Sequence, residues 1–435
     1  MEELYRKYVE AGYRVTTDSR AIKGGEIFFA LRGENFDGND YALKALEDGA
    51  ALAVVNADAA LPDDARLLKV ESPYETLRDL SSYHRQHVRK DGHLPVIGLT
   101  GTNGKTTTKE LIREVLAAKF KVTATEGNLN NDIGVPLSLL KITPETEIAV
   151  IEMGANHPDD IAKLVKVSQP DYGLITNVGK AHLLGFGSFE GVKAAKGELY
   201  NWLGAHRGSV IFLNEDDPDL REMASGQPCH VFGYGLKYQN AEILPTDASN
   251  PYLRIRIGEN TVNTRLVGAY NATNVLAALA IGQYFGVGEK AAISAIEQYC
   301  PSMNRSQLLV AGDSTLIVDA YNANPSSMSV ALDNFAAFNA GSRIALLGDM
   351  RELGEDSLKE HVNIVRKVQA AGLDACYVGE EFRKALDAEG LDGKWFSNSD
   401  ELAEYLRTNR PSGCAYLVKG SRGIRMEKVL EVFGK

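Results

Sequence analysis

One glycine-rich loop stands out in the sequence: Thr100-Gly101-Thr102-Asn103-Gly104-Lys105-Thr106-Thr107-Thr108. An apolar run over residues 95–99 predicts a strand before it, and a helix-forming run over 109–120 follows it. In such a strand–loop–helix, glycines let backbone N–H groups close on a phosphate, and the helix dipole favours the same anion. Lys105 adds a cation, and the Thr106 hydroxyl suits a Mg²⁺ ion. The loop therefore predicts a nucleotide site. Leu99 replaces the first glycine of the strict P-loop pattern, so a glycine turn without a ligand is the alternative.

The composition is that of a globular enzyme. A chain of 435 residues is long enough for about three domains, each with its own core. The net charge of −11 disfavours a nucleic-acid-binding surface. The first residues do not resemble a signal peptide, and no apolar run reaches membrane-spanning length. We therefore expect a cytoplasmic protein, with reduced core thiols at Cys229, Cys300, Cys376 and Cys414.

The order of predicted elements divides the chain into three α/β domains. Residues 1–93 form a small α/β N-terminal domain, with a strand over 25–31 and helices over 41–49 and 75–90. Residues 94–305 alternate strands and helices, which predicts a central P-loop-type ATPase domain with a parallel sheet covered on both faces. Its strands are expected over 95–99, 148–151, 172–177 and 209–213, followed by an antiparallel pair within 253–266 and a helix over 273–285.

The third domain, residues 306–435, alternates again and is predicted to be Rossmann-like. Its strands are expected over 314–319, 343–347, 375–378 and 414–418.

Two polar side chains follow strands of the central sheet. Glu152 comes directly after the strand over 148–151, and His182 follows the strand over 172–177. Functional residues in parallel sheets gather at the carboxyl ends of strands, so both are candidate ligands for a divalent cation beside a triphosphate. Either one alone is weak evidence, because a single Glu or His after a strand is usually an ordinary solvated loop residue.

Lys196 occupies an apolar position of a predicted helix over 188–203. Phe189, Val192, Leu199 and Leu203 mark the apolar stripe at spacings of three and four residues, and position 196 falls on it. One interpretation is a lysine whose stem covers the core edge while its amine reaches water. The other is a buried neutral amine that takes up CO₂ to form an anionic carbamate suited to metal binding.

Three further polar groups are candidate ligands. Asn271 precedes an Ala-rich helix and is either its cap or an adenine contact, since an amide offers a donor and an acceptor together. Arg305 lies at the junction of the second and third domains. The run Asp319 to Pro325 follows the first predicted strand of the third domain, and Asn324-Pro325 is also typical of an Asx turn that starts a helix.

These motifs together resemble the Mur ligases, the ATP-dependent amino-acid and peptide ligases of peptidoglycan precursor synthesis. The resemblance covers nearly the whole chain, and the loop at 100–108 matches the family's ATP loop. Within the family it is closest to the members that add D-alanyl-D-alanine to UDP-N-acetylmuramoyl-tripeptide. The stretches that carry it are Asn128 to Pro136, Thr176 to His182, Lys196 to Leu199, Asp319 to Pro325, Leu347 to Gly354 and Lys419 to Gly423.

The resemblance implies a role for each matching residue. Catalysis is expected from Lys105, Glu152, His182 and Lys196. ATP is expected to contact Gly101, Thr102, Asn103, Gly104, Lys105, Thr106, Thr107, Asn271, Asn274, Arg305 and Asp319. Metal is expected at Thr106, Glu152, His182 and a carbamylated Lys196, as a pair of Mg²⁺ ions. The other substrates are expected at Asp18, Ser19, Arg20, Asn130, Asn131, Tyr321, Asn322 and Asn324.

The same resemblance implies the reaction and the partners. The tripeptide carboxylate would be activated by ATP as an acyl phosphate, and the dipeptide amine would displace phosphate to give the pentapeptide precursor. The partners are then UDP-N-acetylmuramoyl-tripeptide and D-alanyl-D-alanine, with no nucleic acid and no membrane insertion, and the protein is expected to be a monomer. Tyr270 and Asn39 stand where relatives often have His.

Other functions stay open at this point. A Mur ligase that adds the third peptide residue would be expected to carry an Asp-Asn-Pro-Arg motif in the third domain, and the sequence has none. A folylpolyglutamate synthase would start near its ATP loop, whereas a whole predicted domain precedes this one. A catalytically silent nucleotide-binding subunit is disfavoured by the presence of Lys105, Glu152, His182 and Lys196.

Overall fold

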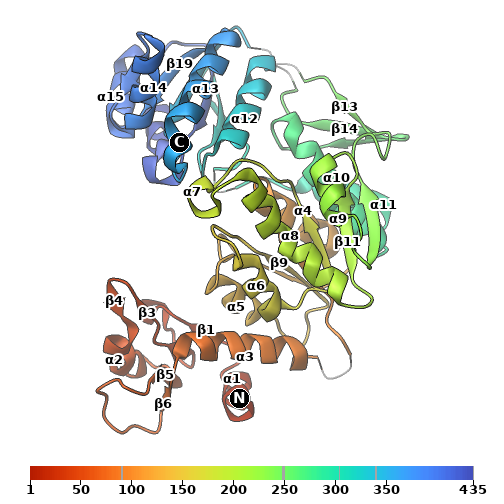
Figure 1. Cartoon of the computed structure of the whole chain (residues 1–435), viewed down its shortest axis with the longest axis vertical. Helices are drawn as coiled ribbons and strands as arrows, with labels where there is room; N and C mark the ends of the chain where they lie inside the picture. The colour runs from red at the N-terminus through yellow and green to blue at the C-terminus, as the bar shows by residue number, and fades with distance from the viewer. Residues whose placement is uncertain (90–91, 247–249, 303, 339, 435) are drawn as a thin grey trace.

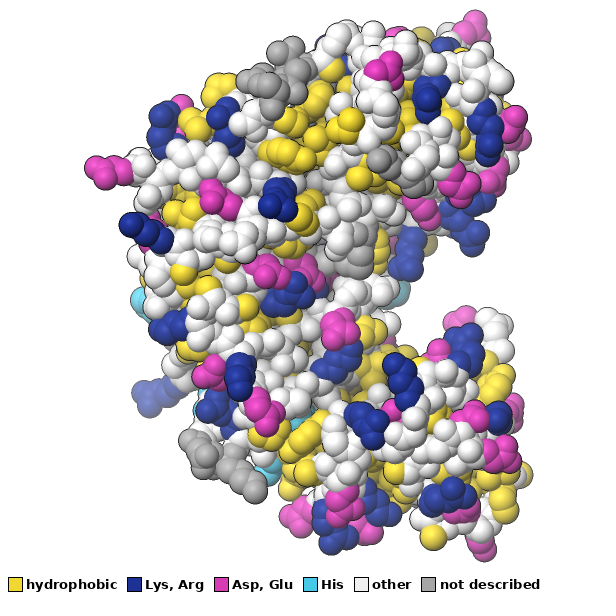
Figure 2. Space-filling view, turned by 180° about the vertical axis from the view of Figure 1, so that it is seen from behind, with side chains coloured by type: hydrophobic (Ala, Val, Ile, Leu, Met, Phe, Trp, Pro, Cys, Tyr) yellow, Lys and Arg dark blue, Asp and Glu magenta, His cyan; other side chains and the backbone are white. Residues whose placement is uncertain are grey.

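The computed structural model describes residues 1–89, 92–246, 250–302, 304–338 and 340–434. The expected α/β fold is confirmed, with three bodies arranged along the long axis: the N-terminal body is at the bottom of Figure 1, the ATP-loop body in the middle and the C-terminal body at the top. From behind, Figure 2 shows a notch on the right that separates the N-terminal body, below, from the C-terminal body, above.

The N-terminal body is built on a four-stranded parallel sheet in the order β1-β2-β5-β6. The strands are β1 (Val15–Thr16), β2 (Ile27–Phe29), β5 (Leu52–Asn56) and β6 (Leu67–Val70), with a hairpin of β3 (Arg32–Gly33) and β4 (Phe36–Asp37). The helices are α1 (Glu2–Glu10), α2 (Ala42–Glu47) and α3 (Pro73–His87).

Helix α3 also joins this body to the next one. Ser72 caps it by accepting the Glu75 N–H at 3.2 Å, and Pro73 occupies its first turn. Near its end, His84 lies 2.8 Å from the Ile142 carbonyl, and the buried Arg85 pairs with Asp171 at 2.9 Å. The first and second bodies are therefore held together by buried polar contacts.

The middle body has a six-stranded, fully parallel sheet in the order β12-β11-β10-β7-β9-β8. The strands are β7 (Val96–Thr100), β8 (Val122–Ala124), β9 (Ile148–Glu152), β10 (Tyr172–Ile175), β11 (Val210–Asn214) and β12 (His230–Tyr234). A separate antiparallel sheet contains β13 (Glu242–Leu244), β14 (Arg254–Ile257) and β15 (Asn260–Asn263).

Helices cover both faces of the parallel sheet, as the sequence predicts. One face packs against α4 (Lys105–Ala117), α10 (Ala272–Tyr284) and α11 (Glu289–Gln298). The other packs against α5 (Gly134–Leu139), α6 (Asp160–Ser168), α7 (Leu183–Phe186), α8 (Phe189–Ala205) and α9 (Pro218–Ala224). Strand β7 is buried along its whole length, so the loop that follows it is anchored in the core.

The C-terminal body contains a six-stranded sheet in the order β16-β17-β21-β18-β19-β20. Strand β16 pairs with β17 in the antiparallel direction, and the pairs β17–β21, β21–β18, β18–β19 and β19–β20 are parallel. The strands are β16 (Gln307–Ala311), β17 (Ser314–Asp319), β18 (Ser342–Gly348), β19 (Asp374–Val378), β20 (Lys394–Phe396) and β21 (Cys414–Lys419). Helices α12 (Pro325–Ala337), α13 (Ser357–Ala370) and α14 (Glu380–Glu389) cover one face, while α15 (Ser399–Asn409) and the 3₁₀ segment Met426–Phe433 cover the other.

Some sequence expectations need correction. The helix after the ATP loop begins at Lys105 and not at residue 109, because Gly104 at φ 78° ends the loop and the threonines form the first turn. The four cysteines are free, but Cys300 is exposed, since it lies just beyond the end of α11, and Cys229 is only partly buried. Among the described residues, no helix combines the length and apolarity needed to cross a membrane.

Candidate functional site

The glycine loop between β7 and α4 has the geometry of an anion cradle. Gly101 and Gly104 take φ values of 143° and 78°, which side-chain-bearing residues rarely adopt. A Cβ on Gly101 would lie 2.0 Å from Thr176 Oγ1, so the close approach of the neighbouring strand end also requires glycine here. Thr176 Oγ1 in turn donates to the Asn103 carbonyl at 2.7 Å. The loop is therefore held in place by the neighbouring strand end.

Lys105 is the cation of this loop. Its Nζ donates to the Gly101 carbonyl at 2.8 Å and to the Thr102 carbonyl at 3.0 Å. Desolvation lowers the pKa of Lys105 to about 8, although the nearby Glu152 carboxylate opposes the shift. A phosphate at this site would add a second anion beside Glu152 and would favour the charged form of Lys105.

Glu152 at the end of β9 faces the loop. Its Oε1 accepts from Thr106 Oγ1 at 3.2 Å and from Asn130 Nδ2 at 2.8 Å. Its Oε2 is buried and has no hydrogen-bond partner among the described residues, which is costly for a carboxylate oxygen. Nowhere in the described chain do three His, Cys, Asp or Glu side chains form a ready-made metal cluster. Mg²⁺ is typically bound by one or two carboxylates and by substrate phosphates, so Glu152 and Thr106 fit such an ion.

His182 lies at the N-terminus of α7 with a φ of 51°. Its Nδ1 contacts the carboxylate of Glu352, which belongs to the loop after β18 in the C-terminal body. The imidazole holds the pKa of Glu352 below its usual range. The predicted metal ligand is thus oriented by a carboxylate from the other body, a contact that sequence reasoning missed.

Lys196 is buried, with 2% of its surface exposed, so the apolar-stripe prediction is confirmed and the snorkelling interpretation is wrong. Its Nζ donates to the Ala155 carbonyl at 3.2 Å and lies 5.3 Å from the Phe186 ring centroid. Burial lowers the pKa of Lys196 to about 7, and the positive charge of Lys105 adds to the shift. A large fraction of this amine is therefore neutral near pH 7.

The two asparagines at the start of α10 lie on the other side of the ATP loop. Asn271 stands at the cap position but makes no cap bond, and its Nδ2 donates instead to the Val267 carbonyl at 2.9 Å. Its Oδ1 accepts from Asn274, whose own Oδ1 accepts from Thr108 Oγ1 at 3.0 Å. This chain of side chains ties α10 to the first turn of α4.

The C-terminal body supplies the opposite wall. Asp319 and the buried Lys419 form an ion pair at the ends of the neighbouring strands β17 and β21. The guanidinium carbon of Arg305 lies 3.6 Å from the Tyr321 ring centroid, and Arg305 Nε is buried with no hydrogen-bond partner in the described structure. Tyr270 OH lies 2.9 Å from Ser306 Oγ, so the tyrosine links α10 to the segment that enters this body.

Asn324 connects the two bodies at the ATP loop. Its Oδ1 accepts the Ser327 N–H at 2.8 Å in a capping box, which confirms the Asx-type helix start. Its Nδ2 donates to Asn103 Oδ1 at 2.8 Å. A second link pairs Lys180 with the buried Glu360 at 2.7 Å. The two bodies therefore meet through side chains beside the loop.

One polar cavity of about 990 Å³ lies between these elements. Most of the predicted site residues line it: Thr102, Asn103, Gly104, Lys105, Thr106, Thr107, Asn130, Asn131, Glu152, His182, Asn271, Asn274, Arg305, Asp319, Tyr321, Asn322 and Asn324. Lys196 lies behind the lining residue Ala155, and Gly101, near the start of the loop, is not among the lining residues. The cavity is large enough for a nucleotide and reacting groups of other substrates.

The predicted residues of the N-terminal body do not line this cavity. Asp18 and Arg20 form an exposed bidentate pair at 2.8 and 2.9 Å, with Ser19 between them in a 3₁₀ turn. Asn39, which stands where relatives often have His, is buried and hydrogen-bonded to Asp37 and Asn56. These residues lie in the N-terminal body, outside the cavity.

Fold and site together define a three-domain, nucleotide-binding α/β enzyme whose cavity is lined mainly by the middle and C-terminal domains. Three family models support this class over most of the chain. The model described as "Mur ligase family, catalytic domain" matches residues 13–87, and the model described as "Mur ligase middle domain" matches residues 99–282. The model described as "Mur ligase, glutamate ligase domain" matches residues 304–422. The chain belongs to the Mur ligase family.

Named relatives resemble the chain over nearly its full length. The UDP-N-acetylmuramoyl-tripeptide–D-alanyl-D-alanine ligase of Escherichia coli (strain K12) is 34% identical, and the alignment covers 96% of this chain and 92% of the relative. Crystal structure I of MurF from Acinetobacter baumannii has a TM-score of 0.82 at 31% identity, covering 97% of this chain and 93% of that one. The crystal structure of MurF ligase from Thermotoga maritima in complex with ADP has a TM-score of 0.81 at 28% identity, covering 97% and 96%.

Proposed function

We infer that this protein is an ATP-dependent ligase that joins D-alanyl-D-alanine to UDP-N-acetylmuramoyl-tripeptide in peptidoglycan precursor synthesis. One observation carries the inference: relatives that bear this activity in their names align with 96% of the chain, at 33% and 34% identity. The cavity between an ATP loop and a Rossmann-like domain is consistent with bringing an activated carboxylate and an amine together.

We propose one substrate for each domain. Residues 1–93, which include Asp18, Ser19 and Arg20, bind the UDP-linked substrate. Residues 94–305 bind ATP on the loop that carries Lys105, and residues 306–435 bind the dipeptide near Tyr321, Asn322 and Asn324. The arrangement of the cavity supports the last two assignments, because the ATP loop and the ends of β17 and β21 face each other across it.

The proposed chemistry has two steps. The tripeptide carboxylate attacks the γ-phosphorus of ATP, the bond to the β-phosphate oxygen breaks, and an acyl phosphate and ADP result. The neutral dipeptide amine then attacks the acyl carbon, phosphate leaves, and the amine loses a proton to form the amide. Lys105 offsets the charge that builds up on the phosphoryl oxygens, and Asn103 and Thr102 hold the loop that orients them.

Mg²⁺ fits beside the loop as part of this proposal. Thr106 and Glu152 would hold one ion, and His182 with a carbamate on Lys196 would hold a second. The ions would neutralise phosphate charge together with Lys105. The buried, unpartnered Oε2 of Glu152 supports a cation at this position.

Carbamylation of Lys196 is part of the same proposal. The neutral amine adds to CO₂, a C–N bond forms, and one proton is released, so the product is an anionic carbamate. The buried position of the amine and its pKa of about 7 support this chemistry near neutral pH. We further propose that the enzyme acts as a monomer in the cytoplasm.

A substrate panel tests the proposal. Purified protein is given ATP, Mg²⁺ and D-alanyl-D-alanine with UDP-N-acetylmuramoyl-tripeptides that differ in the third residue, and ADP is measured together with the mass of the product. We expect ADP and the UDP-linked pentapeptide to form in equal amounts, and only when both the UDP-tripeptide and D-alanyl-D-alanine are present. Failure to form ADP with any tripeptide, in the presence or absence of the dipeptide, would favour the alternative of a catalytically silent nucleotide-binding partner subunit.

A further inference from the structure

Helix α4 carries a second lysine one turn beyond Lys105, and this one is enclosed by the protein. Lys109 has a relative exposure of 0%. Its Nζ donates to the backbone carbonyl of Thr125, which directly follows β8, and lies 2.6 Å from the Glu110 carboxylate. A buried ammonium is costly unless it is paired and hydrogen-bonded, so both contacts compensate its charge. Lys109 is not among the residues that line the cavity, and the chemistry proposed above does not use it.

The contact with Lys109 changes how β8 pairs with β9. The ladder is parallel up to Ala124, and the Thr125 N–H still donates to the Val150 carbonyl at 3.0 Å. In a regular parallel ladder the Thr125 carbonyl would accept the next N–H of β9, which belongs to Glu152. Here Lys109 donates to this carbonyl, and the Thr125 hydroxyl accepts the Glu152 N–H at 3.0 Å. The backbone of Glu152 is therefore placed by a residue that Lys109 fixes.

The loop after β8 also orients the carboxylate of Glu152. Asn130 lies on this loop, which starts at Thr125. The Asn130 amide donates to Glu152 Oε1 at 2.8 Å, and the Asn130 carbonyl accepts the Gly154 N–H at 2.7 Å. The loop that starts at the Lys109 contact thus reaches both the carboxylate of Glu152 and the backbone just beyond it.

We propose that Lys109 is a positioning residue for the metal site, because it fixes Thr125 and, through it, the Glu152 carboxylate. The inference rests on the function proposed above, in which Glu152 and Thr106 hold Mg²⁺ beside ATP. Removing a group that orients a metal ligand without touching the metal typically costs about 10- to 100-fold in metal affinity or activity. Helix α4 would then supply both the cation for the phosphates, Lys105, and the support of the metal ligand.

Removal of the Lys109 ammonium should displace Glu152 and leave the ATP loop intact. Methionine is close to lysine in length and suits an apolar setting, but it cannot donate to Thr125. The Thr125 carbonyl would then be free to take the Glu152 N–H into a regular ladder, which moves the carboxylate relative to Thr106. Lys105 keeps its own contacts with the loop carbonyls. The expected defect is therefore in Mg²⁺ binding and not in nucleotide binding itself.

The test measures how much Mg²⁺ strengthens nucleotide binding. Isothermal titration calorimetry gives the Kd of adenylyl imidodiphosphate, an ATP analogue that is not hydrolysed, once with Mg²⁺ and once with EDTA. The ratio of the Kd in EDTA to the Kd in Mg²⁺ reports the metal site without any turnover. In Lys109→Met this ratio should be smaller than in the wild type by at least about tenfold, with the Kd in EDTA unchanged. Lys109→Arg keeps a charge and a donor and should recover part of the ratio.

Variants of Thr125 follow the path from Lys109 to the metal ligand. Thr125→Val keeps the carbonyl but removes the hydroxyl that accepts the Glu152 N–H, so it should lower the ratio as well. Both residues act through one chain of contacts, so the double variant Lys109→Met/Thr125→Val should lose no more than the worse single variant. Thr125→Ser keeps the hydroxyl and should bind the analogue like the wild type.

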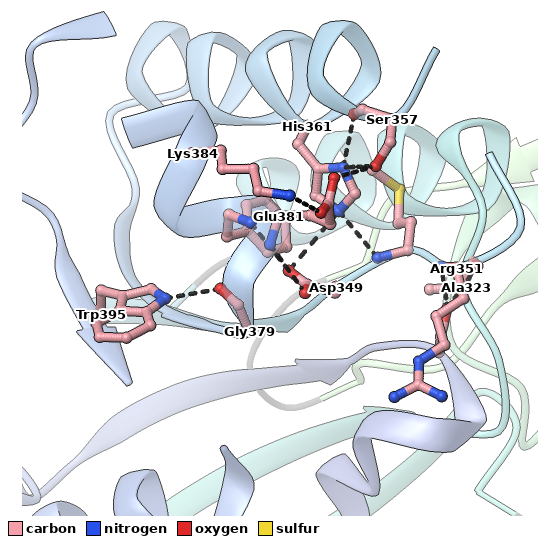
Figure 3. Close-up of polar contacts among 12 residues, drawn as sticks. Ala323, Asp349, Arg351, Ser357, His361, Gly379, Glu381, Lys384 and Trp395 are labelled. Carbon is pink, nitrogen blue, oxygen red and sulfur yellow. Dashed lines mark hydrogen bonds and ion pairs between the residues drawn. The ribbon is translucent and has the colours of Figure 1, made fainter. Parts of the chain in front are cut away.

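Trp395→Phe in the C-terminal domain is the matched control. Figure 3 shows the Trp395 indole pointing at Gly379, whose carbonyl accepts the indole N–H at 2.7 Å. The variant loses the same kind of bond, from a side-chain donor to a backbone carbonyl, and neither residue lines the cavity. Its melting temperature should fall, while its ratio of Kd values should stay that of the wild type.

The outcomes separate this inference from the proposed function. A Lys109→Met protein that melts at a lower temperature but keeps the wild-type ratio would overturn the inference, because Lys109 would then only stabilise the fold. Additive effects of Lys109→Met and Thr125→Val would overturn it as well. Where Lys109→Met does not fold, an unchanged ratio in Thr125→Val overturns the inference in its place. A wild-type protein that binds the analogue equally well in Mg²⁺ and in EDTA would overturn the metal site proposed above, whereas ligation itself is decided by the substrate panel.

Discussion

The imidazole of His182 in the central domain contacts the carboxylate of Glu352 in the C-terminal domain. The backbone supports this contact, because the Leu184 N–H donates to the Glu352 carbonyl at 3.2 Å. Both residues take positive φ values, 51° and 65°, a backbone conformation that residues other than glycine rarely adopt. A residue of the predicted metal site is therefore oriented by a neighbouring domain.

The first prediction concerns the contacts between these domains. A variant with both Glu352→Gln and Glu360→Gln loses the charges that pair with His182 and Lys180. Partly exposed pairs of this kind contribute up to about 1 kcal/mol each, so the ligand-free population should shift several-fold toward separated domains. Small-angle X-ray scattering should show a larger radius of gyration. Glu389→Gln, which removes a pair within one domain, is the control, and identical scattering from all three proteins would count against this role.

The second prediction concerns Lys105. Its side chain contacts loop carbonyls and not the apolar core, so Lys105→Ala should leave circular dichroism and the melting temperature nearly unchanged. Loss of a cation that stabilises transferring phosphate should lower kcat by at least about 10²- to 10³-fold. Phosphate release and ADP formation measure the effect. Near-wild-type turnover would exclude the assigned role.

The third prediction concerns CO₂ on Lys196. With ¹³C-labelled CO₂ held constant, wild-type protein should show a carbamate signal in ¹³C NMR that Lys196→Ala lacks. The amine must be neutral to react, and its pKa is about 7, so the signal should grow as pH rises from 6 to 8. A signal that falls with rising pH, or that persists in the alanine variant, would contradict the assignment.

Activity of position-196 variants provides a second test. Lys196→Ala should lose most of the turnover, and added acetate or formate should restore part of it by occupying the vacated space. Lys196→Arg should stay inactive, because arginine keeps its charge and forms no carbamate. Full activity of Lys196→Arg is the result that the proposal does not allow.

The fourth prediction separates the two roles of Asn324. Asn324→Ser keeps a cap for α12 but loses the bond to Asn103, whereas Asn324→Ala loses both. Loss of a cap costs about 1 kcal/mol, so the melting temperature should fall by a few degrees in the alanine variant only. Both variants should raise the KM for the dipeptide more than that for the UDP-tripeptide. Equal effects on the two KM values would argue against a dipeptide site here.

The features that could be predicted from the sequence depend on residues that are close together in the chain. The ATP loop is recognisable because its requirements fall within nine consecutive residues between a strand and a helix. The burial of Lys196 follows from the period of a single helix. Strand β16 was missed although Gly312-Asp313, between two apolar runs, is a hairpin signal, and Gly312 indeed takes a φ of 63°.

The features that the sequence does not predict depend on contacts between segments that are far apart in the chain. His182 and Glu352 come from different domains, and nothing near either residue in the sequence indicates the partner. The same holds for Ser421, which joins three loops only because β17, β21 and β18 are neighbours in the sheet. The Thr108 hydroxyl meets the Asn274 amide because α10 packs on α4, which a helix pattern does not specify.

An oxygen-tracing measurement tests the central claim most directly. UDP-N-acetylmuramoyl-tripeptide labelled with ¹⁸O in both oxygens of its terminal carboxylate is incubated with the protein, ATP, Mg²⁺ and D-alanyl-D-alanine. An acyl-phosphate ligase transfers one labelled oxygen to phosphate and keeps the other in the new amide, so mass spectrometry should find phosphate with one ¹⁸O and labelled pentapeptide in equal amounts. Unlabelled phosphate, or labelled phosphate without pentapeptide, would contradict the account.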